Sequence, residues 1–324
     1  MSKERILIIE ASNYSQRALK IYSEIGAVYC CNNTPSDWQK KDEISIIVCR
    51  LNYFLDSRLL SKFPNVRILV SPTTGLNHID QTYCEENKIK IISLKGETNF
   101  LDTIHSTSEL AFSLILALVR NIVPGIHSVV SANEWNRDLY CGREFSALTL
   151  GLLGFGRIGQ HMVKYAKAFG MSVFACDPFV DRDIFLKSEV IQCKKEELLS
   201  KTDIISIHVD YRIENKNMLD RDDFIQMGKG KYLVNTSRGE LISENDLIWA
   251  LEKGHLAGAA LDVLAGEQST HDFFNKAIIK YAKKNRHLII TPHIGGCTKE
   301  AMSNTEIFIA EKTKQFFVKK DYAE

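Results

Sequence analysis

Short runs of apolar residues recur along the first hundred residues, and stretches with apolar residues at helical spacing lie between several of them. The runs that predict buried strands are 5–10, 27–31, 44–49, 66–71 and 89–94, and the clearest helical stretch is 15–25. Strands that alternate with helices are typical of βαβ units, whose strands join into a parallel sheet. The first third of the chain therefore predicts one doubly wound α/β unit.

A second and longer series of the same kind begins at residue 148. Its predicted strands are 148–153, 172–176, 204–207, 232–235, 258–261 and 288–291. An apolar helix over 106–120 and a polar stretch around Trp135, Arg137 and Gly142 precede this series, and a helix over 299–317 follows it. The predicted fold class is α/β with two doubly wound parallel-sheet domains, the second roughly twice as long as the first.

The predicted helix over 106–120 is apolar on more than one face. The residues that make it so are Leu110, Ala111, Phe112, Leu114, Ile115, Leu116, Leu118 and Val119. A helix of this kind needs cover on several sides, which a second chain or the chain's own core can give. We predict a homodimer, with burial in the chain's own core as the alternative.

The composition excludes several other classes of protein. Of the 324 residues, 45% are hydrophobic and 25% are charged, which is typical of globular domains and not of disordered or fibrous chains. The net charge of +1 gives no overall attraction to nucleic acid or an anionic membrane. The strongest apolar run, 110–119, is too short to cross a bilayer, and the N-terminus lacks the pattern of a secretory signal. We predict a cytoplasmic protein with no nucleic-acid or membrane partner.

The eight cysteines predict neither a disulfide framework nor a metal site. They are Cys30, Cys31, Cys49, Cys84, Cys141, Cys176, Cys193 and Cys297. The chain is large, no CxxC pair occurs, and no Cys/His spacing matches a known zinc site. Reduced thiols and no metal are therefore expected.

A glycine motif marks the start of the second series. Gly154-Phe-Gly156-Arg-Ile-Gly159 follows a predicted strand and leads into a predicted helix over 160–169. In this context Gly154 allows a tight turn, Gly156 lets the backbone approach a pyrophosphate, and Gly159 lets the helix pack closely on the strand. The helix N-terminus offers free N–H groups to the phosphates. A glycine-rich turn that binds nothing is the alternative, and the strand and helix on either side of the motif weigh against it.

An acidic residue completes the dinucleotide pattern. Asp177 closes the next predicted strand, 18 residues past Gly159, which is close to the spacing that a ribose-binding acid requires. A carboxylate there accepts hydrogen bonds from the ribose hydroxyls and repels a 2′-phosphate. The sequence therefore predicts NAD as the cofactor in preference to NADP.

Three polar residues follow predicted strands of the second series, namely Arg238, Glu267 and His293. Ligands of open α/β sheets bind outside the carboxyl ends of the strands, so these side chains could share one cleft. Histidine can exchange a proton with a hydroxyl as hydride moves, a nearby carboxylate favours its protonated form, and arginine offers a planar fork to a substrate carboxylate. Each residue alone also has an ordinary interpretation as a cap, a loop charge or a solvated acid.

Four motifs in order resemble the D-isomer-specific 2-hydroxyacid dehydrogenases, the family of phosphoglycerate dehydrogenase and glyoxylate/hydroxypyruvate reductase. They are the glycine motif 151–159, the arginine motif 234–239, the glutamate motif 258–263 with Glu267 after it, and the histidine motif 291–296. The resemblance covers nearly the whole chain. It implies NAD-dependent hydride transfer between nicotinamide and a small D-2-hydroxy acid or its 2-keto acid, with 3-phosphoglycerate, glycerate and glycolate as candidates.

The resemblance also implies roles for individual residues. It makes Arg238, Glu267 and His293 catalytic. The cofactor contacts that it implies are Gly154, Gly156, Arg157, Ile158, Gly159, Asp177, His208, Thr236, Asp262 and His293. The substrate contacts that it implies are Thr74, Gly75, Leu76 and Arg238, because the family holds the substrate carboxylate with backbone N–H groups of the loop 73–80.

The family fold implies a split first domain. A Rossmann NAD-binding domain over 103–295 would be inserted in a flavodoxin-like substrate domain, which 1–102 begins and the C-terminal helix in 296–324 completes. Three residues depart from the family pattern: Asn77 stands where Asp is common, and Asp210 and Gln268 stand where Pro is common. The first of these could alter substrate preference.

Some alternatives stay open at this point. Arg50 and Arg58 lie near strand ends of the first unit, where they could bind a second substrate anion such as a phosphate or remain solvated. NAD-binding corepressors share the fold and recruit peptides, so a corepressor-like sensor is the alternative function. Formate dehydrogenase is a further alternative. Its pattern resembles a Gln–His pair, whereas here Glu267 occupies the position of the glutamine. NADH oxidation with a panel of 2-keto acids distinguishes these functions.

Overall fold

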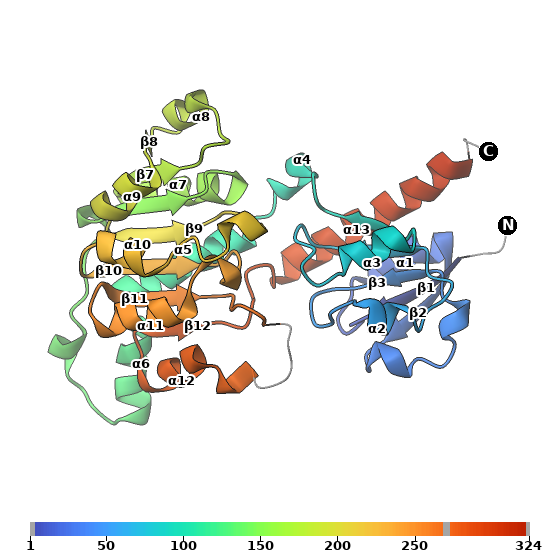
Figure 1. Ribbon diagram of the computed structural model, residues 1–324, viewed down its shortest axis with the longest axis horizontal. Coiled ribbons are helices and arrows are strands. Elements are labelled where there is room, and N and C mark those ends of the chain that lie inside the picture. Colours follow the sequence, from blue (N-terminus) through green and yellow to red (C-terminus); the bar gives the residue numbers. More distant parts are fainter. Residues whose placement is uncertain (1–3, 268–272, 322–324) are drawn as a thin grey trace. The chain divides into compact units, whose positions relative to one another are not determined.

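The computed structural model describes residues 4–267 and 273–321, and the chain divides into two compact units (Figure 1). The first unit comprises residues 1–104 and 298–324, and the second comprises residues 105–297. The boundaries expected after residues 102 and 295 lie two residues before the observed ones. Gln268 lies outside the described residues.

The first unit is built on a five-stranded parallel sheet in the order β2-β1-β3-β4-β5. Its strands are β1 (Glu4–Ile9), β2 (Gly26–Cys31), β3 (Ile46–Val48), β4 (Ile68–Ser71) and β5 (Lys90–Ser93). This is the flavodoxin-like strand order. The predicted fold of the split domain is therefore confirmed.

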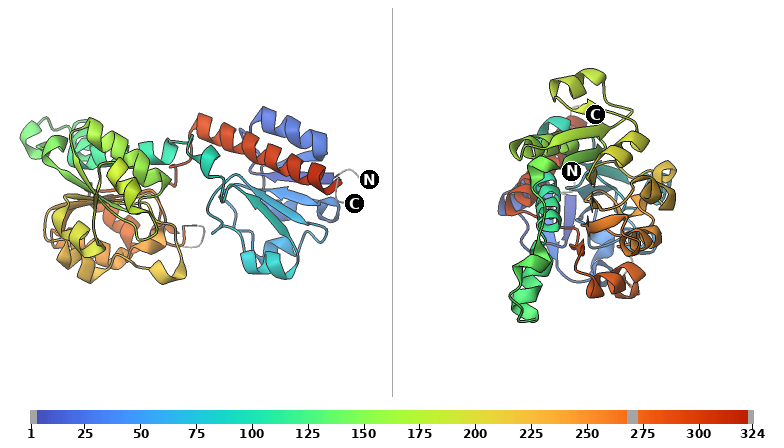
Figure 2. Two further views of the ribbon diagram at one scale, coloured as in Figure 1. Left: turned by 90° about the horizontal axis from the view of Figure 1, so that it is seen from above. Right: turned by 90° about the vertical axis from the view of Figure 1, so that its left-hand side faces the viewer.

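Helices cover both faces of this sheet because each strand is apolar on both sides. They are α1 (Gln16–Ile25), α2 (Ser57–Leu60), α3 (Gln81–Glu86), α4 (Thr98–Leu101) and α13 (Lys299–Asp321). Ile6 and Ile8 pack under α1 and α13, while Leu7 packs with Leu60 and Phe63 on the opposite face. Figure 2 shows α13 beside α1, so the end of the chain completes the unit that its beginning started.

The second unit contains a seven-stranded parallel sheet in the order β12-β11-β10-β9-β6-β7-β8. Its strands are β6 (Thr149–Leu153), β7 (Ser172–Cys176), β8 (Ile191–Gln192), β9 (Ile204–Ile207), β10 (Lys231–Asn235), β11 (Leu256–Leu261) and β12 (Leu288–Ile290). The strand order reverses between β6 and β9. In open α/β sheets this switch point is where a crevice forms at the carboxyl ends of the strands.

Two helical layers enclose this sheet. The helices are α5 (Ser106–Val119), α6 (Ile122–Ser131), α7 (Arg157–Ala168), α8 (Arg182–Lys187), α9 (Lys195–Lys201), α10 (Arg221–Gln226), α11 (Glu244–Glu252) and α12 (Ala277–Lys284). Helices α5, α7 and α8 share a core with one face of the sheet, and α9 to α12 share a second core with the other face. The predicted Rossmann domain is confirmed.

Helix α6 occupies the start of a segment for which only a polar stretch was expected. Pro124 and Gly125 obscure it in the sequence, but a proline in the first turn of a helix removes only an N–H that has no partner within the helix. The helix after the glycine motif also begins earlier than predicted, at Arg157. The two-residue strand β8 gave no apolar run from which it could be predicted.

The chain's own core covers most of the apolar helix α5. Ala111, Ile115 and Val119 are fully buried, whereas Leu110 and Leu116 are partly buried. Large exposed apolar side chains lie instead on α6, where Ile126 is 59% and Val130 is 74% exposed. Among the described residues no single helix is long and apolar enough to span a membrane, and α5 and α6 meet that criterion only as a pair bent by 63°.

Candidate active site

The glycine motif forms the turn between β6 and α7. Gly154 has a φ of +96°, and a Cβ there would lie 2.5 Å from the carbonyl oxygen of His208. A Cβ on Gly159 would lie 2.5 Å from the carbonyl oxygen of Gly154. A Cβ on Gly156 would meet no described atom within 4 Å, so the backbone there is open to a ligand at the N-terminus of α7. Arg157 and Ile158 are the first two residues of that helix.

Asp177 also holds this turn in place. One carboxylate oxygen accepts a hydrogen bond from Phe155 N at 2.8 Å, and the other accepts one from Phe179 N at 2.9 Å. An ionised carboxylate has about four acceptor positions, so capacity for ribose hydroxyls remains. Asp177 therefore combines a structural role in the turn with the position expected of the ribose-binding acid.

Two buried polar atoms lie at the carboxyl ends of neighbouring strands. His208 follows β9 and Thr236 follows β10, and His208 Nδ1 and Thr236 Oγ1 make no hydrogen bond to any part of the chain that the structure describes. Burial lowers the pKa of His208 to about 3, so the ring is neutral, and its Nε2 lies 2.9 Å from Ser206 Oγ. Buried polar atoms normally have partners. With the open Gly156 backbone, these atoms fit a bound dinucleotide.

The loop after β10 carries Arg238, and the buried Asn235 shapes it. Asn235 Nδ2 donates to the carbonyl oxygen of Arg238 at 2.8 Å, and its Oδ1 accepts from Ser237 N at 2.9 Å. Ser237 Oγ donates to the carbonyl oxygen of Ile207 at 2.8 Å, which ties the loop to β9. Asn235 stands within the arginine motif, but its role in shaping the loop was not predicted.

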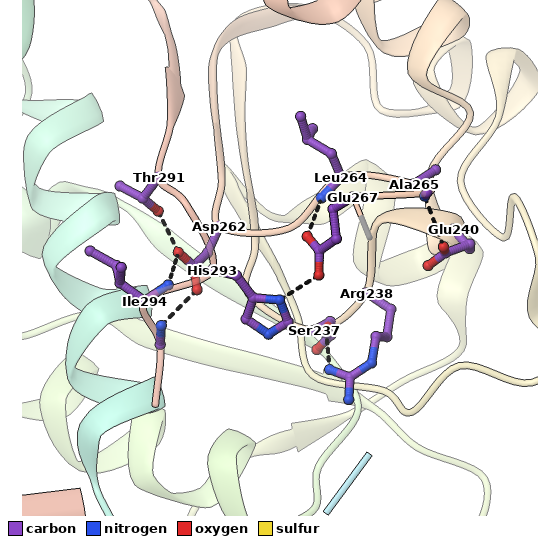
Figure 3. A network of polar contacts seen from close by, with 12 residues as sticks. Ser237, Arg238, Glu240, Asp262, Leu264, Ala265, Glu267, Thr291, His293 and Ile294 are labelled. Carbon is purple, nitrogen blue, oxygen red and sulfur yellow. Dashed lines mark hydrogen bonds and ion pairs between the residues drawn. The ribbon is translucent and has the colours of Figure 1, made fainter. Parts of the chain in front are cut away.

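Glu267 and His293 meet at the next two strand ends (Figure 3). His293 Nδ1 and Glu267 Oε1 form a hydrogen bond, and Glu267 Oε2 accepts from Leu264 N at 3.1 Å. His293 has a φ of +54°, which a non-glycine residue seldom adopts, and its N–H donates to the carbonyl oxygen of Asp262 at 2.9 Å. The unusual backbone holds the imidazole toward Glu267.

Asp262 fixes the turn that carries His293. The Asp262 side chain is 1% exposed, and it accepts hydrogen bonds from Thr291 Oγ1 at 2.6 Å, Ile294 N at 2.8 Å and Gly295 N at 2.7 Å. Burial raises the pKa of Asp262, and these hydrogen bonds oppose that rise. Its evident structural role is to position His293. A contact with the nicotinamide carboxamide stays a prediction.

Backbone packing joins the arginine loop to the glutamate loop. A Cβ on Gly239 would lie 2.0 Å from Leu264 C and 2.1 Å from Ala265 N, so any side chain at position 239 would separate the two loops. Glu240 accepts from Gly266 N at 3.2 Å. The two loops therefore form one rigid platform.

A charged pair holds the other side of the glutamate loop. Glu244 Oε1 accepts from Ala265 N at 3.0 Å and lies 2.9 Å from Lys276 Nζ, which itself donates to the carbonyl oxygen of Ala265. No local pattern predicts this pair, because Lys276 lies 32 positions after Glu244. Both polar groups of the Ala265 backbone are thus satisfied.

Burial and three nearby carboxylates act on the charge of Arg238. Burial lowers the pKa of the Arg238 guanidinium from its ordinary value, and the carboxylates of Glu267, Glu240 and Asp210 oppose that effect. One guanidinium nitrogen donates to the carbonyl oxygen of Ser237 at 2.5 Å. A half-buried guanidinium beside an imidazole–carboxylate pair can bind a carboxylate and exchange a proton next to it.

Comparison with known proteins places this geometry in a family. A sequence model described as the NAD binding domain of D-isomer specific 2-hydroxyacid dehydrogenases matches residues 112–295. The chain belongs to this family. It is 31% identical over 270 residues to the hydroxypyruvate reductase of Thermotoga maritima, a match that covers 83% of this chain and 84% of that protein. The family resemblance stated from the sequence motifs is confirmed.

Other relatives in this 2-hydroxyacid dehydrogenase family are longer. The chain is 35% identical over 258 residues to the D-3-phosphoglycerate dehydrogenase of Bacillus subtilis, which covers 80% of this chain and 46% of that protein. The chain thus spans about half the length of the curated phosphoglycerate dehydrogenases that it matches. A D-lactate dehydrogenase from Aquifex aeolicus, solved with NAD and lactic acid, superposes with a TM-score of 0.82 at 27% identity over 98% of this chain and 96% of that one.

The remaining predicted site residues belong to the first unit. Thr74, Gly75 and Leu76 lie in the loop that follows β4, with Thr74 exposed and the other two half-buried. Asn77 is exposed in the same loop. In the second unit, Asp210 pairs with Arg212 at 3.2 Å on the surface. Within residues 4–267 and 273–321, no cluster of three His, Cys, Asp or Glu side chains could hold a metal ion.

The two arginines considered for a substrate phosphate have other partners. Arg50 forms a buried ion pair with Glu306, whose side chain is 2% exposed, and its guanidinium also donates to the carbonyl oxygens of Glu10 and Ser12. Arg58 is 90% exposed and pairs with Asp56. The Arg50 side chain is 17% exposed, and its guanidinium is already paired with Glu306.

Proposed function

We propose that this chain is an NAD-dependent D-2-hydroxyacid dehydrogenase that works as a 2-keto acid reductase in the reverse direction. The observation that carries the proposal is the His293–Glu267 hydrogen bond beside Arg238, in the same unit as a complete dinucleotide-binding turn. NAD, when bound, supplies or accepts the hydride. The relatives named above are dehydrogenases and reductases, which favours an enzyme over a corepressor-like sensor.

The chain's own residues divide the remaining work between them. Because Nδ1 of His293 faces Glu267, the other ring nitrogen, Nε2, is the atom that can give a proton to the keto oxygen or take it from the hydroxyl. The Glu267 carboxylate stabilises the charged imidazole and orients it. Arg238 offers N–H donors in one plane, which suits a carboxylate. Reduction therefore needs His293 protonated, and oxidation needs it neutral.

The partners and exposure of Arg50 and Arg58 support an unphosphorylated substrate. A phosphorylated substrate needs a free cation for its second anion, and the Glu306 contact of Arg50 and the exposure of Arg58 leave neither suited to that task. We therefore propose unphosphorylated short 2-keto acids, such as hydroxypyruvate and glyoxylate, with glycerate and glycolate as the matching hydroxy acids. The 3-phosphoglycerate alternative would require Arg50 to leave Glu306.

A panel of keto acids tests this proposal directly. NADH oxidation is followed with hydroxypyruvate, glyoxylate, 2-oxoglutarate and 3-phosphohydroxypyruvate. We expect the highest kcat/KM with the first two. Turnover of the phosphorylated acid alone would contradict the substrate class, and NADH oxidation with none of a broad set of keto acids would contradict the proposed activity.

The cofactor preference depends on Asp177. We expect kcat/KM with NADH to exceed that with NADPH by at least roughly tenfold, because the carboxylate repels a 2′-phosphate. Asp177→Ala should narrow that ratio. The variant also loses the hydrogen bonds to Phe155 and Phe179, so NADH itself should bind more weakly and the ratio is the quantity to compare. Equal efficiency of the wild type with both cofactors would rule the preference out.

We further propose a cytoplasmic homodimer that acts without nucleic acid or membrane. Support for the location comes from the net charge of +1 and the eight free cysteines, which suit a reducing compartment. Support for the dimer comes from the exposed apolar side chains of α6. Light scattering at micromolar concentration should give twice the chain mass for the wild type and the chain mass for Val130→Asp.

A matched control separates this surface from a general loss of solubility. Leu186 on α8 is 63% exposed, so Leu186→Asp places the same charge on another exposed apolar position. That variant should remain a dimer. A monomeric wild type at the same concentration would contradict the proposed assembly.

A further inference from the structure

A buried histidine lies behind the predicted substrate loop of the first unit. His78 is 1% exposed, and its Nε2 lies 3.0 Å from Ser71 Oγ. Ser71 Oγ lies 2.8 Å from Thr73 Oγ1, which donates to the carbonyl oxygen of Gly75 at 2.8 Å. Four groups therefore form one continuous hydrogen-bond chain from the core to the loop.

The chemistry of the four groups fixes the direction of every bond in this chain. The Gly75 carbonyl can only accept, so the single hydroxyl proton of Thr73 is committed to it. Ser71 must then donate to Thr73, and His78 Nε2 must carry a proton and donate to Ser71. Cys49 agrees with this assignment, because its thiol donates to the carbonyl oxygen of Val70 and its sulfur lies 3.8 Å from Nε2. Bonds aligned in one direction polarise and strengthen one another.

This chain of hydrogen bonds sets the orientation of one peptide group in the loop. In a trans peptide the C=O and the N–H point to opposite sides. Since Thr73 holds the Gly75 carbonyl on the core side, the N–H of Leu76 points away from the core. The carbonyl oxygens of Thr73 and Leu76 are also occupied, by Leu94 N and Ile79 N, each at 3.0 Å.

Three consecutive N–H groups of this loop can bind a ligand. Those of Thr74, Gly75 and Leu76 make no hydrogen bond to any other described residue. Backbone N–H groups are strong donors, and adjacent ones that point outward make an anion-binding site. A carboxylate is the ligand chemistry that such a group of donors takes.

We propose that His78 is a positioning residue for substrate carboxylate binding, acting through Ser71 and Thr73 on the Gly75–Leu76 peptide. The inference deepens the proposed function and rests on it. His78 touches no reacting atom. Its Nε2 proton sets the direction of all the hydrogen bonds in this series. Those hydrogen bonds keep the loop in the conformation that presents its N–H groups.

A matched pair of substitutions at Thr73 tests this role. Thr73→Val keeps the shape and removes the hydroxyl, whereas Thr73→Ser keeps the hydroxyl. At saturating NADH we expect Thr73→Val to raise KM for the keto acid about tenfold with kcat within about twofold, because one hydrogen bond that orders the binding loop is lost. Thr73→Ser should restore KM close to the wild-type value, and the Kd for NADH should be the same in all three proteins.

A second link and a second readout make the test independent of turnover. Ser71→Ala interrupts the same chain, so the double variant with Thr73→Val should raise KM no further than either single change. Binding of oxamate, a keto-acid analogue that is not reduced, should weaken in parallel with KM. The ¹⁵N spectrum of the His78 ring should show a proton fixed on Nε2 in the wild type.

The outcomes distinguish the positioning role of His78 from the proposed dehydrogenase activity. An active wild type whose Thr73→Val variant keeps the wild-type KM and oxamate affinity contradicts the positioning role alone. The same holds for a His78 ring protonated on Nδ1 only. A wild type that oxidises NADH with no keto acid contradicts the proposed function, whatever the ring spectrum shows.

Discussion

Arg238→Lys is expected to lower kcat/KM for keto-acid reduction by about a hundredfold, which corresponds to roughly 3 kcal/mol of transition-state stabilisation. Lysine keeps the charge but replaces a planar fork with a single point donor. The guanidinium is half-buried, and the rigid loop held by Asn235 leaves little freedom for a shorter ammonium to reach the same place. Steady-state kinetics with NADH and hydroxypyruvate measure the effect.

The control for this variant is an arginine outside the site. Arg137 is 95% exposed and pairs only loosely with Asp138, so Arg137→Lys makes the same chemical change on the surface. Its kcat/KM should match the wild type. The Kd of Arg238→Lys for NADH should also be unchanged, and a loss of NADH binding that accounts for the whole effect would mean that Arg238 serves the cofactor instead of the substrate.

Glu267→Gln is expected to lower kcat/KM for keto-acid reduction by at least about tenfold, which corresponds to roughly 1.4 kcal/mol. The Glu267 carboxylate orients His293 through the bond at Nδ1, and its negative charge stabilises the imidazolium from which the keto oxygen takes its proton. Glutamine keeps the shape of the side chain and removes the charge. Steady-state kinetics with NADH and hydroxypyruvate measure the effect.

Glu240→Gln provides a matched control for this charge effect. Glu240 holds Gly266 N of the same loop and does not bond to His293, so its replacement removes a nearby carboxylate without touching the imidazole. Its kcat/KM should fall by no more than about threefold. An unchanged kcat/KM in a folded Glu267→Gln protein that binds NADH would show that Glu267 does not assist proton transfer by His293.

The sequence predicted most of the fold because its strands are continuous apolar runs. The predicted strand 204–207 is buried on both sides and has the same bounds as β9. The glycine motif correctly predicted the turn after β6. Helix α6 was not predicted because Pro124 in its first turn is a residue that usually breaks helices. Strand β8 was not predicted because two residues are too few to show an alternating pattern. These are local failures of pattern, and they leave the topology intact.

The residues of the candidate site could be predicted from the sequence, but the ion pairs and hydrogen bonds that hold their loops in place could not. Strand ends placed Arg238, Glu267 and His293 near one another. The pairing of Glu244 with Lys276 and of Arg50 with Glu306 depends on tertiary contacts across the chain, the second over 256 positions, which no local pattern encodes. The left-handed backbone of His293 likewise results from the hydrogen bonds that Asp262 makes around it.

The position of α13 has a consequence for the order in which the chain can fold. Ser15 N and Glu306 are joined by a hydrogen bond across 291 positions, so α1 cannot gain its neighbour until the last helix has been synthesised. Residues 105–297 form a continuous unit and can fold as soon as they have left the ribosome. Tyr22 and the face of α1 that packs against α13 stay exposed until α13 has been synthesised. Closing so long a loop costs little more entropy than closing one of half its length, but the contact forms late. During synthesis the first unit is therefore begun before the second unit and completed after it, and a nascent chain halted before residue 306 would leave Arg50 without its acidic partner.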